Sequence, residues 1–175
     1  RITVNLPAEP TDEMYKALRR AIIETTDLED CTIDLNLLGA KVIGVKAFGY
    51  HADGTPEAPR ALRSVFLPDA TLIKEDAFRD LNILSVSAPK VTEIEDGAFY
   101  GSTDLAEINF PKLKVVGPNV FGCCYALEEV TLPELTIVDV WSFAICRNLK
   151  VLNLPKVEVV NAGAFYGSYV LEKIT

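Results

Sequence analysis

The sequence predicts an α/β solenoid, in which about six coils of 21 or 22 residues stack through short parallel strands, with an N-terminal helix that caps the stack. Three observations lead to this prediction. A pattern of apolar residues recurs at a fixed period over most of the 175 residues, a proline and a phenylalanine keep one place in successive copies, and residues 1–30 show helical spacing instead. A fixed period of this length indicates coils that bury a core only by stacking on one another.

Two independent columns of residues carry the repeat. The four most regular units, each of 22 residues, read ILSVSAPKVTEIEDGAFYGSTD, LAEINFPKLKVVGPNVFGCCYA, LEEVTLPELTIVDVWSFAICRN and LKVLNLPKVEVVNAGAFYGSYV. The prolines lie at Pro68, Pro89, Pro111, Pro133 and Pro155, and the phenylalanines at Phe78, Phe99, Phe121, Phe143 and Phe165. Both columns step by 21, 22, 22 and 22 residues, which excludes a chance coincidence.

Residues 1–30 are expected to form the N-terminal cap of the stack. An exposed end coil would leave strand edges and apolar side chains open to solvent, so a lid is needed there. We expect a helix over about residues 12–25, because its residues have helical spacing and a capping residue precedes them. The predicted N-cap is Thr11 or Asp12, and the predicted apolar face is Met14, Leu18, Ala21 and Ile22. A separate functional helix is the alternative.

Each unit then opens with a very short strand. In the unit that starts at Leu127, the apolar residues Val130 and Leu132 share one side with it, which is the alternation of a strand. Proline has no amide hydrogen to give to a sheet. We therefore expect Pro133 to mark the corner where the strand ends, so that no ladder bond is lost.

The remainder of each unit predicts a second strand and a turn. β-Branched residues such as Ile137 and Val138 favour a second short extended segment. Glycine or asparagine often follows, as a turn with positive φ requires. These residues are Gly97, Gly117, Asn119 and Gly163. The phenylalanine is then expected to close the coil in a short helical or 3₁₀ turn.

The chain is therefore organised as a single repeat domain over residues 1–175. After the cap, residues 31–50 form a first coil, in which Leu38 takes the place of the proline. Residues 51–61 are an inserted loop, residues 62–170 form five regular coils, and residues 171–175 begin a partial coil.

Composition excludes several classes of partner. The net charge of −8 disfavours nucleic acid and anionic lipid, because both require a basic surface. No apolar run reaches the roughly 20 residues that span a bilayer, so no membrane insertion is expected of this segment. The chain begins at Arg1 without a leader, and we expect a targeting segment to have been removed.

The units resemble bacterial BspA-like leucine-rich repeats over residues 32–175 or so. The match in one unit consists of Leu127, Val130, Leu132, Pro133, Ile137, Val138, Phe143 and Cys146. Unlike ordinary leucine-rich repeats, the units lack an asparagine after the strand. The resemblance implies a right-handed superhelix, secretion or display on a bacterial surface, and a role in adhesion or protein binding. Similar repeats also occur in some protozoan surface proteins.

No motif in the sequence points to catalysis, to a cofactor or to a metal. A histidine-dependent triad would have to use His51, the one histidine, and no serine or cysteine motif accompanies it. Glu128 and Glu129 are adjacent, so on a strand they face opposite ways and make a poor acid–base pair. No phosphate-binding loop, zinc motif or basic aromatic patch is present. We expect no enzyme and no cofactor.

Two cysteines share one place in the repeat. Cys124 and Cys146 stand where other units have Ser102 and Ser168, which predicts small buried side chains stacked on neighbouring coils. Stacked free thiols are the preferred interpretation. A disulfide between them is the second interpretation, if the geometry permits it.

The outward positions of the first strands are the candidate binding surface. They form the column Phe66, Ser87, Asn109, Thr131 and Asn153, flanked by Ser64, Ser85, Glu107, Glu129 and Val151. Repeat proteins commonly bind partners along such a face. Phe66 and Trp141 depart from their columns as aromatic residues, which are favoured anchors at interfaces, although Trp141 also fits plain packing over its neighbours. The loop around Gly54 is the last part of the candidate binding surface.

These features predict a non-enzymatic module, secreted or on the cell surface, that binds an unknown protein or glycan partner through its sheet face. A structural spacer within a larger surface protein is the first alternative. A glycan-active β-helix enzyme is a remote one. The oligomeric state is left open by the sequence.

Overall fold

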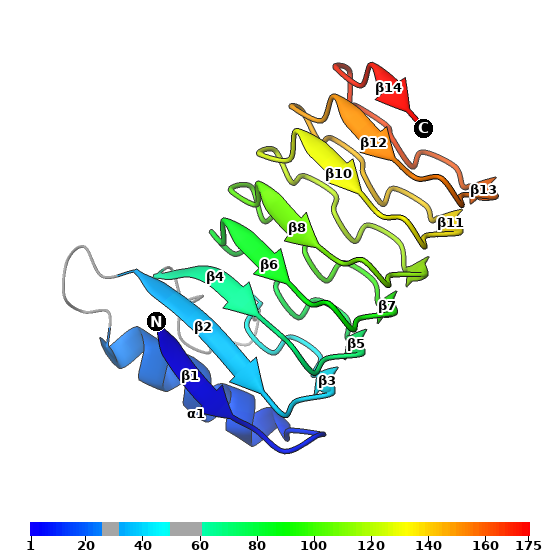
Figure 1. Cartoon of the computed structure of the whole chain (residues 1–175). Coiled ribbons are helices and arrows are strands. Elements are labelled where there is room, and N and C mark those ends of the chain that lie inside the picture. The colour runs from blue at the N-terminus through cyan, green and yellow to red at the C-terminus, as the bar shows by residue number, and fades with distance from the viewer. Residues whose placement is uncertain (26–31, 50–60) are drawn as a thin grey trace.

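The computed structural model describes residues 1–25, 32–49 and 61–175. It confirms a solenoid of stacked coils, each with two short strands (Figure 1). The first strands of the coils are β2 (Ile33–Leu38), β4 (Leu62–Phe66), β6 (Ser85–Ser87), β8 (Glu107–Asn109), β10 (Glu129–Thr131), β12 (Val151–Asn153) and β14 (Lys173–Ile174). The second strands are β3 (Val42–Ile43), β5 (Leu72–Ile73), β7 (Glu93–Ile94), β9 (Val115–Val116), β11 (Ile137–Val138) and β13 (Val159–Val160). The inserted loop expected at 51–61, including His51 and Gly54, lies outside the described residues apart from Ala61.

All strand pairs are parallel, and their register follows the repeat. Ser64 lies opposite Ser85, and Ser85 lies opposite Glu107, so equivalent residues of successive coils are neighbours. Each proline lies two residues after the end of a first strand, at the corner, as expected. The Phe-containing segments are runs of turns whose hydrogen bonds join residues three apart, as from the Tyr100 amide to the Gly97 carbonyl (2.9 Å). This is the bonding of a 3₁₀ turn, one of the two expected forms, and not of an α-helix.

The core is a set of columns that run through the coils. Inward residues from every coil form one buried apolar cluster. Its most regular column is the row of phenylalanines, in which Phe78 stacks on Phe99 with centroids 5.2 Å apart, and Phe121 stacks on Phe143 at the same distance. The row extends to Phe48 at one end and to Phe165 at the other. These stacked rings are an apolar contact that recurs between neighbouring coils.

A second column satisfies the buried carbonyl groups beside these rings. Ser102 donates a hydrogen bond to the Phe78 carbonyl (2.8 Å), and Ser168 donates one to the Phe143 carbonyl (2.7 Å). Between them, the thiols of Cys124 and Cys146 lie 3.2 and 3.1 Å from the carbonyls of Phe99 and Phe121. Each of these buried carbonyl groups therefore accepts a hydrogen bond from a serine or cysteine of the next coil. In this chain the row of short donors takes the place of an asparagine ladder.

The coils turn through the left-handed region at two repeat positions. One column lies two residues before the phenylalanine and has φ between 51° and 66°: Lys46, Asp76, Gly97, Asn119, Trp141 and Gly163. The other lies two residues after it: Asp80, Gly101, Cys123, Ile145 and Gly167. Three of the four turn residues expected from the sequence are therefore correct. Gly117 was expected to have positive φ and does not; instead, a Cβ there would lie 2.8 Å from the Asp96 amide nitrogen, so the close approach of the chains explains the glycine.

The N-terminal segment contains the expected helix and an additional strand. Helix α1 (Asp12–Thr25) begins after Thr11, whose hydroxyl accepts a bond from the Met14 amide (3.3 Å) as an N-cap. Strand β1 (Ile2–Asn5), which the sequence did not predict, pairs with β2 and extends the sheet by one strand. In Figure 1 both lie at the N-terminal end of the stack.

The buried face of α1 differs from the expected one. Ile22 is buried and Leu18 is partly buried against the core, as expected. Tyr15 and Arg19 are buried as well, whereas Met14 and Ala21 are exposed. The reason is polar anchoring: the Tyr15 hydroxyl donates to the Val42 carbonyl (2.9 Å), and Arg19 donates to the carbonyls of Lys46 and Ala47. Burial raises the pKa of Tyr15 to about 12, so the phenol stays a donor.

The row of first strands is interrupted once. One sheet runs β1-β2-β4-β6-β8 and another runs β10-β12-β14, and no ladder joins β8 to β10 in the described part of the chain. The second strands show the same interruption between β9 and β11. The turns of the two coils remain bonded, because the Phe121 amide still donates to the Ser142 carbonyl (2.8 Å). Figure 1 shows a wider gap between β8 and β10 than on either side.

The donor column predicts the effect of substitution at Cys146. Cys146→Ala is expected to lower the free energy of unfolding by about 2 kcal/mol, because it leaves the buried Phe121 carbonyl without a donor. Cys146→Ser keeps a donor and is expected to cost less than about 1 kcal/mol. Urea unfolding of both variants measures the difference. Equal losses would show that the thiol contributes packing alone.

The interruption predicts a local difference in amide hydrogen exchange. In other coils the amide that follows the first strand is bonded, as Ala88 to Asn109 (3.0 Å) and Leu132 to Asn153 (3.0 Å). The equivalent amide of Phe110 lacks such a bond to Thr131 in the described structure. We expect Phe110 and Glu129 to exchange much faster than Ala88 and Leu132. Protection of Phe110 equal to that of Ala88 would show that the sheet is continuous in solution.

Candidate binding surface

The predicted surface column lies on the outward face of the first strands, in two pieces. Phe66, Ser87 and Asn109 are opposite one another on β4, β6 and β8. Thr131 and Asn153 are opposite one another on β10 and β12. The interruption between β8 and β10 separates the two pieces. The column that the repeat period predicted is therefore discontinuous at its middle.

Short polar side chains dominate this face and bond along it. The Asn109 amide group donates to the Ser87 hydroxyl (3.0 Å), and the Ser64 hydroxyl donates to the Asp34 carboxylate. Phe66 interrupts this polar surface with a ring that is 38% exposed. An exposed ring among small polar groups is a common composition for the centre of a protein interface.

Trp141 lies elsewhere, in the turn beyond β11. Its side chain is 40% exposed. Its ring packs over Gly163, where a Cβ would lie 3.2 Å from the indole, and its centroid lies 5.1 Å from that of Tyr166. Both interpretations of Trp141 thus have support, because the ring packs on the next coil and still presents surface. Phe66 and Trp141 belong to different rows of strands and cannot be treated as one patch.

A shallow groove lies on the face of the first strands, next to the interruption. It has a volume of about 390 Å³ and is lined by Ser85, Val86, Ser87, Ala106, Glu107, Ile108, Asn109 and Glu129. Ile108 is partly exposed there, whereas its equivalents in the neighbouring coils, Val86 and Val130, are each only 2% exposed. The missing ladder therefore exposes apolar surface at the base of the groove.

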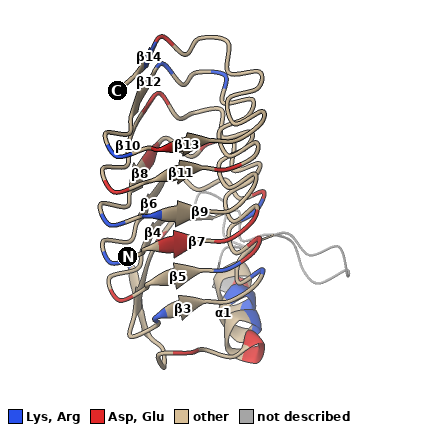
Figure 2. Ribbon diagram, turned by 90° about the vertical axis from the view of Figure 1, so that its right-hand side faces the viewer, with Lys and Arg blue, Asp and Glu red and all other residues tan. Residues whose placement is uncertain are grey.

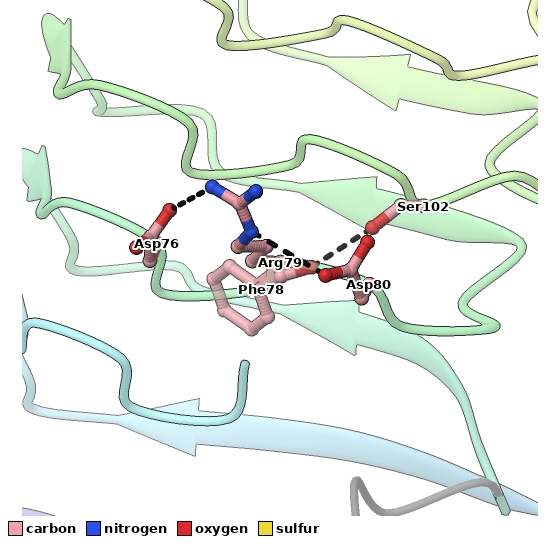
Figure 3. A network of polar contacts seen from close by, with 5 residues as sticks. All are labelled: Asp76, Phe78, Arg79, Asp80 and Ser102. Atoms are coloured by element: carbon pink, nitrogen blue, oxygen red, sulfur yellow. Dashed lines mark hydrogen bonds and ion pairs between the residues drawn. The ribbon is translucent and has the colours of Figure 1, made fainter. Parts of the chain in front are cut away.

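A polar cluster that the sequence did not reveal lies near the turns of β5 and β7 (Figure 3). Arg79 lies between Asp76 and Asp80, at 3.0 and 3.3 Å, and its guanidinium stacks over the Tyr100 ring at 4.5 Å. Burial opposes the charge on Arg79, but the bonds to these carboxylates outweigh it and raise its pKa. The spacing DAFRD, residues 76–80, was the available signal. Because Arg79 forms ion pairs with both carboxylates, the cluster stabilises the turn.

The three cysteines of the described residues are free thiols. Cys124 and Cys146 are buried, and Cys123 is partly exposed. Burial raises the pKa of Cys146 to about 12 and raises that of Cys124 as well. Both thiols therefore stay protonated and unreactive near neutral pH.

Ion pairs join adjacent coils around the outside. Lys90 contacts Asp69 (2.8 Å), Lys156 contacts Glu134 (2.7 Å) and Lys150 contacts Glu128 (3.0 Å). Figure 2 shows charges of both signs along the loops between the two rows of strands. The Lys90 hydrogen bond lowers the pKa of Asp69. The Glu128 carboxylate is thus paired with Lys150. Its neighbour Glu129 takes part in none of the ion pairs of the described residues.

Two negative findings apply to the residues that the structure describes. None of their helices is long and apolar enough to cross a membrane. No cluster of three or more histidine, cysteine, aspartate or glutamate side chains within them is arranged to hold a metal ion.

Comparison with known families and structures gives two kinds of match. Residues 71–175 match the BspA type Leucine rich repeat region, with six copies. No curated protein sequence matches significantly. Among solved structures, a leucine rich cell surface protein from Faecalibacterium prausnitzii A2-165 aligns with a TM-score of 0.64 at 22% identity, over 78% of this chain and 43% of that one.

The pneumococcal vaccine antigen PcpA aligns with a TM-score of 0.65 at 22% identity, over 78% of this chain and 36% of that one. This chain thus spans less than half the length of either protein. At 22% identity the structural similarity establishes the fold alone. The family match identifies the type of repeat in residues 71–175.

The buried thiols predict a pattern of chemical labelling. In a Cys31→Ser background at pH 8, we expect a disulfide reagent to label Cys123 in the folded protein and to reach Cys124 and Cys146 only after unfolding. Mass spectrometry of the labelled peptides identifies each site. Recovery of a peptide pair linked through Cys124 and Cys146, without added oxidant, would instead establish the disulfide.

Proposed function

Because this chain belongs to the BspA type leucine-rich repeat family, we propose that it is a non-enzymatic binding module of an extracellular or cell-surface protein. Its outward sheet face takes a protein or glycan partner. The single observation that carries the proposal is the exposed ring of Phe66 within an ordered polar face. A half-exposed ring on a rigid sheet offers apolar contact area at little entropic cost.

The surroundings of Phe66 fit this role. Its strand is paired on both sides, with β2 and with β6, so the backbone that carries the ring is held by both neighbours. The flanking Ser64 and Ser87 are half-buried and offer hydroxyl groups for the polar rim of a contact. Display on a surface is supported by the similarity to the Faecalibacterium protein, which is a leucine rich cell surface protein.

The proposal predicts selective capture on an array of extracellular-matrix proteins and glycans. Phe66→Ala is expected to weaken capture of the bound component by about tenfold or more, as loss of an interface anchor does. Thermal unfolding should change little, because the ring is already partly in solvent. Val115→Ala is the matched control, since Val115 is an exposed apolar residue on β9 of the other strand row.

Trp141→Ala and replacement of the loop around Gly54 distinguish the remaining candidates. If Trp141→Ala weakens capture and Phe66→Ala does not, the contact lies at the turns and not on the sheet face. If the chain captures nothing from the array, the module is a spacer. Turnover of a polysaccharide by the purified chain would contradict both.

A further inference from the structure

The interruption between β8 and β10 leaves backbone groups of the two strands unpaired where the strands face each other. In the intact pairs, the amides of Ala106 and Glu107 donate to the Leu84 carbonyl (2.9 and 3.1 Å), and those of Lys150 and Val151 donate to the Glu128 carbonyl. The equivalent bonds to the Ala106 carbonyl do not form in the described chain. Peptide groups at the interruption are thus open to an external partner.

The groove at this point combines apolar and acidic surface. Val86 and Ile108 lie at its base, and Glu107 and Glu129 lie on either side of the interruption. Both carboxylates are exposed, and neither forms an ion pair in the described structure. The amide of Asn109 and the hydroxyl of Ser87 add neutral polar groups on the same strands.

Among the described residues, no basic side chain pairs with these two carboxylates: Arg63 and Lys150, on neighbouring coils, pair with Asp104 and Glu128 instead. The outward positions of β4, β6, β8 and β10 hold Ser64, Phe66, Ser85, Ser87, Glu107, Asn109, Glu129 and Thr131. The nearest basic residue in the same column is Lys173, on β14, two strands away from β10. The groove is therefore the acidic part of an otherwise neutral polar face, which favours a cationic partner.

We propose that this groove binds an extended segment of a partner protein and receives one lysine or arginine side chain between Glu107 and Glu129. The inference rests on the proposed function and names the chemistry of the partner. The aliphatic stem of such a side chain packs on the exposed part of Ile108, and its charged end meets the carboxylates and the open Ala106 carbonyl. A bare metal ion is a poorer occupant, because only two carboxylates face the groove.

A titration with a defined peptide tests this inference directly. The probe is a blocked decapeptide of alternating threonine and valine with one central lysine, added to the full chain and followed by amide chemical shifts. We expect shifts to concentrate on β6, β8 and β10. The same peptide with norleucine, which keeps the stem and lacks the charge, should not bind measurably.

The matched variants separate a specific site from general attraction to an acidic protein. Glu107→Gln with Glu129→Gln is expected to weaken peptide binding by about fivefold or more. Glu93→Gln with Glu158→Gln removes the same charge from exposed positions elsewhere and should leave binding unchanged. Equal weakening by both pairs, or shifts spread over the surface, would overturn the proposal.

The array distinguishes failure of this inference from failure of the proposed function. A captured partner that depends on Phe66 and is indifferent to the Glu107 and Glu129 substitutions would refute the groove and leave the binding module intact. A chain that captures nothing from the array while the lysine peptide binds at β8 and β10 would support the groove and refute capture through Phe66.

Discussion

The structure depends on one constraint: no coil can bury its own inner side chains or satisfy its own backbone groups. Each coil has two strands of two to six residues, which is too little for an independent sheet. Neighbouring coils must therefore supply both the apolar contacts and the hydrogen-bond partners. The repeated inward residues of this chain each supply an apolar contact or a hydrogen-bond partner to a neighbouring coil, at the same position in successive coils.

The phenylalanines and the short donors beside them meet it together. Stacked rings such as Phe78 on Phe99 hold coils in register, but they bring backbone carbonyls into the core next to them. The serine or cysteine three residues after a phenylalanine donates a hydrogen bond to the carbonyl of the phenylalanine in the preceding coil. Serine and cysteine are interchangeable here because the position requires one small donor. Cysteine reactivity has no part in this arrangement, since burial keeps these thiols protonated.

The interruption between β8 and β10 shows that the two kinds of contact are separable. The turns remain bonded across it, as at Phe121 and Ser142, whereas the strands do not pair. The core stays closed at the turns and opens at the outward face. The groove at the interruption thereby combines exposed apolar surface, unpaired backbone groups and two carboxylates without an ion-pair partner among the described residues. A repeat surface needs such a difference if it is to bind a partner at one position along its length.

The sequence by itself determined the coil length, the strand positions, the corner prolines, the aromatic column, the shared position of Cys124 and Cys146, and a helix over 12–25 with Thr11 or Asp12 as its cap. These features are local or strictly periodic, so one unit read against the next reveals them. Only the tertiary structure decided that β8 and β10 do not pair, that β1 joins the sheet, that Tyr15 and Arg19 and not Met14 face the stack, and that Phe66 and Trp141 lie on separate surfaces. Each of these depends on small displacements between coils or on bonds between residues distant in sequence, and a periodic pattern assigns equivalent residues the same surroundings.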